Sequence, residues 1–93
     1  MTNSEKATKY QVLVNKRSRE FLNKLDKLAY NNILGKILSL EDDSRPTGCI
    51  KLSIQDAYRI RWSVYRILYT IDDNNKIILV YDIEHRKNVY RKK

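Results

Sequence analysis

The chain has 93 residues, of which 42% are hydrophobic, and its 19 Lys and Arg against 11 Asp and Glu give a formal net charge of +8. This length predicts a single domain, and the apolar content favours a globular fold over disorder. No apolar run approaches the ~20 residues of a membrane-spanning helix, and the polar N-terminus does not resemble a signal peptide, so we predict a cytoplasmic protein with no membrane partner.

The positive charge is the first indication of a binding partner. A small body with this charge attracts polyanions, and nucleic acid is the default class, although an acidic protein or a membrane surface would also match. Cys49 is the only cysteine and His85 the only histidine. Neither an internal disulfide nor a Cys/His metal site is therefore predicted, and we expect no metal and no cofactor.

The first half of the chain predicts a short strand followed by two amphipathic helices. Residues 10–14 alternate as a strand, and Asn15 or Ser18 can cap a first helix over 16–29. A break is expected at 30–32, with a second helix after it. The apolar stripes of the two helices comprise Phe21, Leu22, Leu25, Leu28 and Ala29, and then Ile33, Leu34, Ile37, Leu38 and Leu40. Since neither helix can bury its stripe alone, a sheet must receive both.

The second half predicts β-structure after a loop over 41–48 that holds the only proline. The expected strands cover 57–62, 65–71 and 76–83, with turns at 63–64 and 72–75. The last strand is almost continuously apolar, as in a strand covered on both faces. The order β-α-α-β-β-β predicts an α+β fold, a twisted antiparallel sheet with a helical hairpin packed on one face. We expect one domain over 1–93, with a disordered N-terminus at 1–8 and a frayed basic tail at 91–93.

Three arginines stand in the middle of the best strand patterns. Arg59 and Arg61 share the face of strand 57–62 opposite its aromatic residues, and Arg66 lies on the next strand. Surface strands often carry cations for solubility and edge protection. However, like charges opposed on neighbouring strands destabilise the pairing by about tenths of a kcal/mol. A bound anion would offset that repulsion, so the three arginines predict an anion site.

The C-terminal segment adds further cations. Residues 84–93 hold five Lys or Arg and one Glu, which is also typical of a solvated, frayed end. Because this segment follows the most apolar strand directly, its first residues are expected close to the sheet. His85, Arg86 and Tyr90 would then lean over the other arginines.

If the anion is RNA, one reaction fits these residue types. RNA carries its own nucleophile, the 2′-hydroxyl, so an enzyme can cleave it without a metal by aligning that hydroxyl and stabilising charge on the phosphate. Arg suits the second task because its planar fork pairs with two phosphate oxygens and stays charged. Candidates for general acid–base work are Tyr90, His85 and, less well suited, Lys87.

Each of these residues also has a structural interpretation. His85 could be a hydrogen-bonded structural residue, and Trp62 is expected to pack on the side opposite Arg59 and Arg61. The pair Asp72 and Asp73 is interpreted as a turn. Packing is favoured over base stacking for the tyrosines Tyr58, Tyr65, Tyr69 and Tyr81.

The sequence resembles the RelE/ParE superfamily of toxins from toxin–antitoxin pairs, from about Tyr10 to Arg91. The resemblance rests on a strand, a helical hairpin and three ordered segments. These segments are SRPTGCIKL at 44–52, YRIRWSVYRILYTIDD at 58–73 and HRKNVYR at 85–91. RelE-like members of the superfamily cut mRNA in the ribosomal A site, whereas ParE-like members poison DNA gyrase and generally lack the basic catalytic set.

The resemblance implies roles for individual residues. It assigns phosphate binding to Arg59, Arg61 and Arg66, transition-state stabilisation to Arg86, and activation of the 2′-hydroxyl to Tyr90. His85 is kept as a further catalytic candidate, because some relatives have lysines at the positions of Arg59 and Arg61 and an arginine cannot act as the base. The additional RNA-binding candidates are Lys51, Lys87 and Arg91.

A ribosome-dependent, metal-independent endoribonuclease that inhibits translation is therefore the first expectation. The alternative is a ParE-like gyrase inhibitor that binds rather than catalyses. A third is a degenerate toxin whose remaining role is to bind antitoxin and operator DNA as part of a repressor complex. The resemblance implies a RelB-like antitoxin, the ribosome and mRNA as partners, with operator DNA bound only through the antitoxin. The family often has Gly and Asp in the turn where this chain has Ser63 and Val64, which predicts a local difference.

Overall fold

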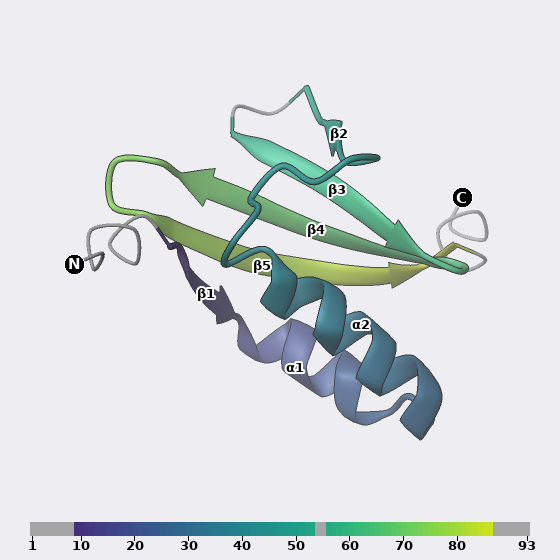
Figure 1. The fold of residues 1–93 in the computed structure, drawn as a ribbon. Helices are drawn as coiled ribbons and strands as arrows, with labels where there is room; N and C mark the ends of the chain where they lie inside the picture. The colour runs from purple at the N-terminus through teal and green to yellow at the C-terminus, as the bar shows by residue number, and fades with distance from the viewer. Residues whose placement is uncertain (1–8, 54–55, 87–93) are drawn as a thin grey trace.

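The computed structural model describes residues 9–53 and 56–86 (Figure 1). The elements are β1 (Gln11–Val14), α1 (Lys16–Asn23), α2 (Lys27–Ser39), β2 (Ile50–Lys51), β3 (Ala57–Trp62), β4 (Tyr65–Asp72) and β5 (Ile77–His85). The predicted α+β order is confirmed, with the short β2 added before the three long strands. The expectations for residues 1–8 and 91–93 lie outside the described residues. No helix in the described part is both long and apolar enough to cross a bilayer.

The strands form one five-stranded sheet in the order β1-β5-β4-β3-β2. Strands β2 to β5 pair antiparallel, as predicted, but β1 pairs parallel with β5, from Gln11 opposite Ile77 to Val14 opposite Val80. The sheet is therefore mixed rather than wholly antiparallel. Short turns determine the direction of β3, β4 and β5, whereas the alternation in β1 carries no information about its partner.

The connection between the two helices lies earlier in the chain than the sequence predicted. Asn15, one of the two caps expected for the first helix, caps α1 by accepting the Ser18 N–H at 2.9 Å. The break, however, lies at residues 24–26 and not at 30–32. Asp26 caps α2 by accepting the Ala29 N–H at 2.8 Å. An aspartate side chain that accepts a hydrogen bond from an otherwise unpaired backbone N–H strongly favours the start of a helix. The asparagines at 31 and 32 are accommodated inside α2.

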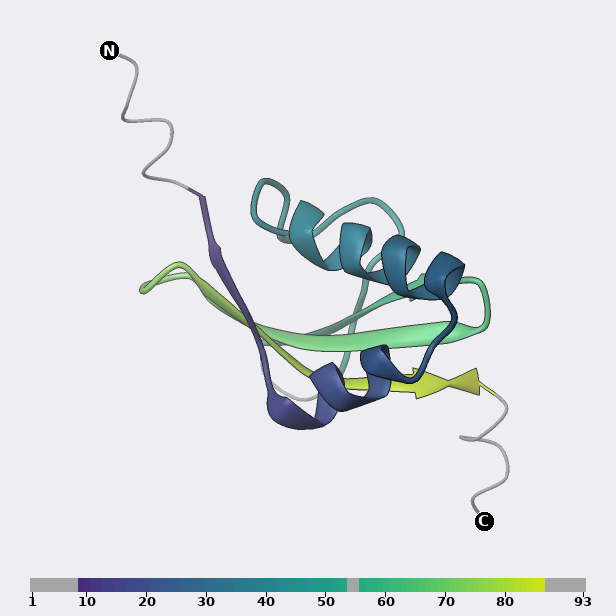
Figure 2. The ribbon, with the colours of Figure 1, turned by 90° about the horizontal axis from the view of Figure 1, so that it is seen from below.

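The core lies between α2 and the sheet, while α1 runs beside β5 (Figures 1 and 2). Ile33 and Ile37 of α2 are 0% exposed and belong to the same core cluster as residues of β3, β4 and β5. Leu28 and Leu38 were predicted in the apolar stripes but are 69% and 50% exposed. In the continuous helix α2 the buried residues Ala29, Ile33 and Ile37 recur every four positions and form one stripe. Both leucines lie outside this stripe and are therefore exposed.

The second face of the sheet is not covered by the helices. In β5, Ile78 and Val80 are buried but Leu79 between them is exposed, so the predicted coverage of this strand on both faces is wrong. In β3, Tyr58 and Ile60 point into the core, and the intervening residues point to the uncovered face. This alternation decides where the strand arginines lie.

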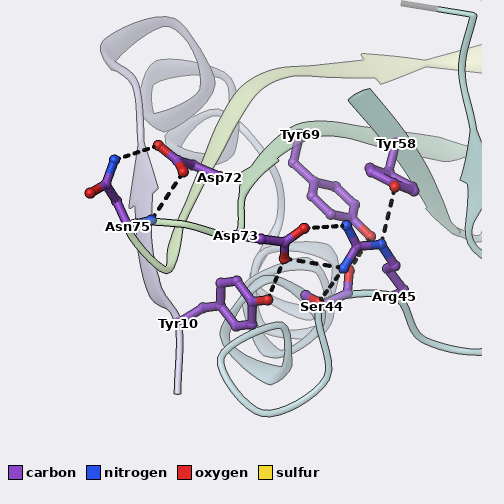
Figure 3. A network of polar contacts seen from close by, with 8 residues as sticks. All are labelled: Tyr10, Ser44, Arg45, Tyr58, Tyr69, Asp72, Asp73 and Asn75. Atoms are coloured by element: carbon purple, nitrogen blue, oxygen red, sulfur yellow. Dashed lines mark hydrogen bonds and ion pairs between the residues drawn. The ribbon is translucent and has the colours of Figure 1, made fainter. Parts of the chain in front are cut away.

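A polar network anchors the loop between α2 and β2 (Figure 3). The buried Tyr69 hydroxyl donates to the Ser44 carbonyl at 2.9 Å, and burial raises the pKa of Tyr69. Arg45 pairs with Asp73 at 2.9 Å and donates from Nε to the Tyr58 hydroxyl at 3.0 Å. The loop is therefore held to β3, to β4 and to the β4–β5 turn.

We expect Asp73→Asn to change the pH dependence of stability. Hydrogen bonds from Arg45 and Tyr10 hold the pKa of Asp73 below its ordinary value. A carboxyl group whose pKa is lower in the folded state than in the unfolded state stabilises the fold at pH values above its unfolded-state pKa of ~3.9. This contribution is lost as the pH falls through the folded-state pKa. The difference in unfolding free energy between the wild type and Asp73→Asn should thus be constant near neutral pH and shrink in acid.

Urea unfolding measured across this pH range checks the expectation. The control is Asp43→Asn, which removes an exposed carboxylate of the same chain and so measures the effect of losing one surface charge. A difference between Asp73→Asn and the wild type that persists undiminished in strong acid would contradict the assigned ion pair.

Candidate functional site

The strand arginines meet on the uncovered face of the sheet. Arg61 on β3 is the direct cross-strand partner of Arg66 on β4, whose other neighbour in the register is Glu84 on β5. Directly opposed like charges disfavour strand pairing, and Glu84 offsets only part of this charge. The fold therefore brings together two guanidinium groups at a cost in stability, as the sequence predicted.

Arg86 lies at the same end of the sheet. Its backbone N–H donates to the Val64 carbonyl at 2.7 Å, which ties the end of β5 to the β3–β4 turn. Arg61, Arg66 and Arg86 then line one small cleft next to that turn. Within the turn Ser63, and not the β-branched Val64, takes the positive φ of 57°, which explains how this pair replaces Gly and Asp.

Arg59 completes the group of four that we call the arginine cluster (Arg59, Arg61, Arg66 and Arg86). Burial, followed by the charges of Arg61 and Arg66, lowers the pKa of Arg59 from its ordinary value. Among the described residues, the Nε atoms of Arg59 and Arg66 are buried without a hydrogen-bond partner. Buried polar groups usually have partners. These two atoms therefore indicate a site for a ligand that accepts hydrogen bonds.

Two further sequence candidates lie away from the arginine cluster. The His85 ring packs edge-on against Tyr65, with 5.1 Å between ring centroids, and these two residues are cross-strand partners. Tyr65 faces Phe21 of α1, so His85 lies on the opposite face of the sheet from Arg66. Lys51 lies 6.0 Å from the ring centroid of Tyr58, on the core side. The candidates Tyr90, Lys87 and Arg91 lie outside the described residues.

The expected packing of the aromatic residues agrees with the structure. Tyr58 and Tyr69 are buried and stack on each other, with 5.9 Å between ring centroids. Trp62 stacks on Tyr65 and packs against the core on the side opposite Arg61. Asp72 and Asp73 belong to the β4–β5 turn, where Asp72 accepts the Asn75 N–H at 3.0 Å. None of these residues belongs to the arginine cluster.

One part of the surroundings of the arginine cluster follows from no sequence pattern. A cavity of about 490 Å³ adjoins Arg59 and Arg61 and is also lined by Lys36 of α2 and Thr47 of the preceding loop. Thr47 lies in the segment SRPTGCIKL, but nothing in that segment indicates a cavity shared with the distant Lys36. Only the packing of α2 and the loop against β3 brings them together.

The arginine cluster is suited to bind a phosphate group and to stabilise added negative charge on it. Guanidinium groups form paired hydrogen bonds with phosphate oxygens and retain their charge at any working pH. For the same reason none of the four arginines can serve as a general base. A reaction at this site needs a proton acceptor from elsewhere.

Comparisons with known proteins relate the chain to toxins. The family model described as the ParE toxin of the type II toxin–antitoxin system parDE matches residues 5–90. The RelE4 protein of Methanocaldococcus jannaschii is 27% identical over 73 residues, which cover 77% of this chain and 78% of that protein.

Solved structures share the fold. The archaeal RelE–RelB complex of Pyrococcus horikoshii contains a chain that superimposes with a TM-score of 0.77 and 28% identity, over 84% of this chain and 96% of that one. The isolated RelE toxin of Escherichia coli superimposes with a TM-score of 0.73 and 21% identity, over 87% and 90% of the two chains. The second of these likenesses concerns the fold alone.

Proposed function

Because the chain belongs to the ParE toxin family of type II toxin–antitoxin systems, within the RelE/ParE superfamily, we propose that it is a RelE-type endoribonuclease that cleaves mRNA in the ribosomal A site. One observation carries the proposal. Arg61 and Arg66 are directly opposed across two strands, and Arg86 lines the same cleft. A purely structural sheet has no need of this repulsive arrangement, whereas a phosphodiester would neutralise it.

In the proposed reaction the 2′-hydroxyl of the RNA attacks the adjacent phosphorus atom. The bond from phosphorus to the 5′-oxygen breaks, which leaves a 2′,3′-cyclic phosphate on one fragment and a 5′-hydroxyl on the other. The proton of the 2′-hydroxyl passes to a base, and an acid protonates the departing 5′-oxygen. Arg61 and Arg66 hold the phosphate, while Arg86 stabilises the charge that develops in the transition state.

We assign the alignment or activation of the 2′-hydroxyl to Tyr90, by resemblance to the family. His85, a further candidate, packs against Tyr65 on the face opposite Arg66. Packing is thus the role that its described surroundings support. The proposed reaction needs no metal, because the substrate supplies the nucleophile and the guanidinium groups supply the positive charge.

An antitoxin is the expected protein partner of a toxin of this superfamily, and related RelE chains have been solved in complexes with RelB. An acidic or amphipathic antitoxin would match the net charge of +8. We propose that such an antitoxin, RelB-like in kind, covers the arginine cluster and that operator DNA is bound only through it.

A ParE-like gyrase inhibitor is the second candidate function, and the match to the ParE family model favours it. As a binding protein, an inhibitor of this kind requires no arrangement of groups around a scissile phosphate. The opposed arginines and the buried Nε atoms of Arg59 and Arg66 therefore favour the ribonuclease over the gyrase inhibitor.

Brief induction of the toxin in cells distinguishes the two functions. We expect protein synthesis to stop first, and mapped mRNA ends to show new 5′-hydroxyl termini in phase with codons. DNA breaks and a damage response that appear while translation continues would contradict the ribonuclease and support the gyrase inhibitor. Cells that show neither effect, although the chain still binds its antitoxin, would contradict both.

A further inference from the structure

The cavity beside the arginine cluster lies between α2, the loop before β2 and the edge of β3. Its volume is about 490 Å³, within the range of ordinary ligand pockets. We call it the α2–β3 cavity. It is lined by Lys36, Ser39, Pro46, Thr47, Gly48, Ile50, Arg59, Ile60 and Arg61.

The lining combines positive charge with hydroxyl groups and an apolar wall. Lys36, Arg59 and Arg61 contribute the charge, and none of the described residues that line the cavity is acidic. Thr47 adds a hydroxyl group, and Ile50, a large apolar residue, is 47% exposed. A nucleotide has matching parts, since its phosphate is anionic, its ribose carries hydroxyl groups and its base has flat apolar faces.

The wall formed by the loop is held in place before any ligand binds. The Cys49 N–H donates to the Pro46 carbonyl at 3.0 Å, which closes a tight turn with Gly48 at a φ of 94°. Positive φ at this position is typical of glycine in type II turns. The preceding Arg45 is anchored by Asp73 and Tyr58, as Figure 3 shows. A preorganised wall loses less entropy when a ligand binds.

The α2–β3 cavity is connected with the proposed cleavage site through one residue. Arg61 lines this cavity and also the small cleft that contains Arg66 and Arg86. A single-stranded chain whose scissile phosphate lies at the cleft would therefore have its neighbouring nucleotide beside Arg59 and Arg61. The third cation of the cavity lining is Lys36 of α2.

We propose that the α2–β3 cavity binds the nucleotide of single-stranded RNA that adjoins the scissile phosphate, with Lys36 and Thr47 as its contacts. The proposal rests on the ribonuclease function and adds a binding subsite to it. Lys36 contacts a phosphate of the RNA backbone, and the Thr47 hydroxyl contacts the base. Neither residue takes part in the chemical step.

Equilibrium binding to an uncleavable RNA tests the subsite. The probe is a short, fluorescent, single-stranded RNA in which every 2′-hydroxyl is methylated, so that binding is measured by anisotropy without cleavage. We expect Lys36→Ala to weaken binding several-fold and to reduce the salt dependence of log K by about 0.7, the contribution of one phosphate contact in single strands. The isosteric Thr47→Val should weaken binding without changing the salt slope.

The matched control is Lys27→Ala, which removes the same charge from the first turn of α2. If Lys36→Ala and Lys27→Ala have equal effects and Thr47→Val has none, the subsite is wrong. Arg66→Ala tests the proposed function separately, because Arg66 lines the cleft but not the α2–β3 cavity, and its loss should weaken binding of the same probe strongly. Weakening by Arg66→Ala without a specific effect at Lys36 or Thr47 overturns the subsite alone. Absence of binding by the wild type overturns the subsite, whereas the ribonuclease function is decided by the induction experiment.

Discussion

Replacing Arg86 by alanine is expected to lower the rate of mRNA cleavage by about 10²–10³-fold, the usual loss when one preorganised donor to developing charge is removed. Arg86 lines the cleft together with Arg61 and Arg66, so its guanidinium group can reach the same phosphate. Its side chain is exposed, and the protein should therefore keep its fold. Single-turnover cleavage of mRNA on purified ribosomes measures the effect.

Two further variants serve as comparisons in this measurement. Arg19→Ala removes an exposed arginine from α1, on another part of the surface, and should cleave at nearly the wild-type rate. Arg86→Lys keeps the charge but loses the planar fork, so its rate should lie between those of Arg86→Ala and the wild type. If Arg86→Ala cleaves as fast as Arg19→Ala, Arg86 has no part in the reaction.

The largest loss of stability is expected for Ile37→Ala, at about 2–5 kcal/mol of unfolding free energy. Ile37 is fully buried in the core cluster between α2 and the sheet, so its truncation leaves a cavity. Leu25, which the sequence also placed in an apolar stripe, is only partly buried at the helix connection and should cost less. Urea unfolding followed by circular dichroism measures both changes.

Leu38→Ala is the control for this prediction, because it removes a side chain of the same size from the exposed side of α2. Its effect should stay within about 0.5 kcal/mol. Equal destabilisation by Ile37→Ala and Leu38→Ala would contradict the described orientation of α2. Since the cavity beside β3 depends on α2, a strong core variant should also weaken RNA binding through loss of the folded state.

Most of the arginine cluster could be predicted, because the positions of its residues depend on segments that are close together in the sequence. The alternation of β3 alone places Arg59 and Arg61 on the face opposite Tyr58 and Ile60. A short turn then brings β4 back beside β3, and that turn sets Arg66 opposite Arg61. The position of His85 was less predictable, because it depends on the register of β5 against β4 and on a bulge near residue 69.

The sequence by itself determined the features that depend on neighbouring residues: the α+β order, the cap at Asn15, the turn at Ser63 and the alternation that exposes the strand arginines. Only the tertiary structure decided the parallel pairing of β1 with β5, the outward orientation of Leu28 and the cavity that joins Lys36 to Arg61. The physical reason is that periodicity and turn chemistry act over a few residues. Strand partners and cavity walls, in contrast, depend on how distant segments share one core.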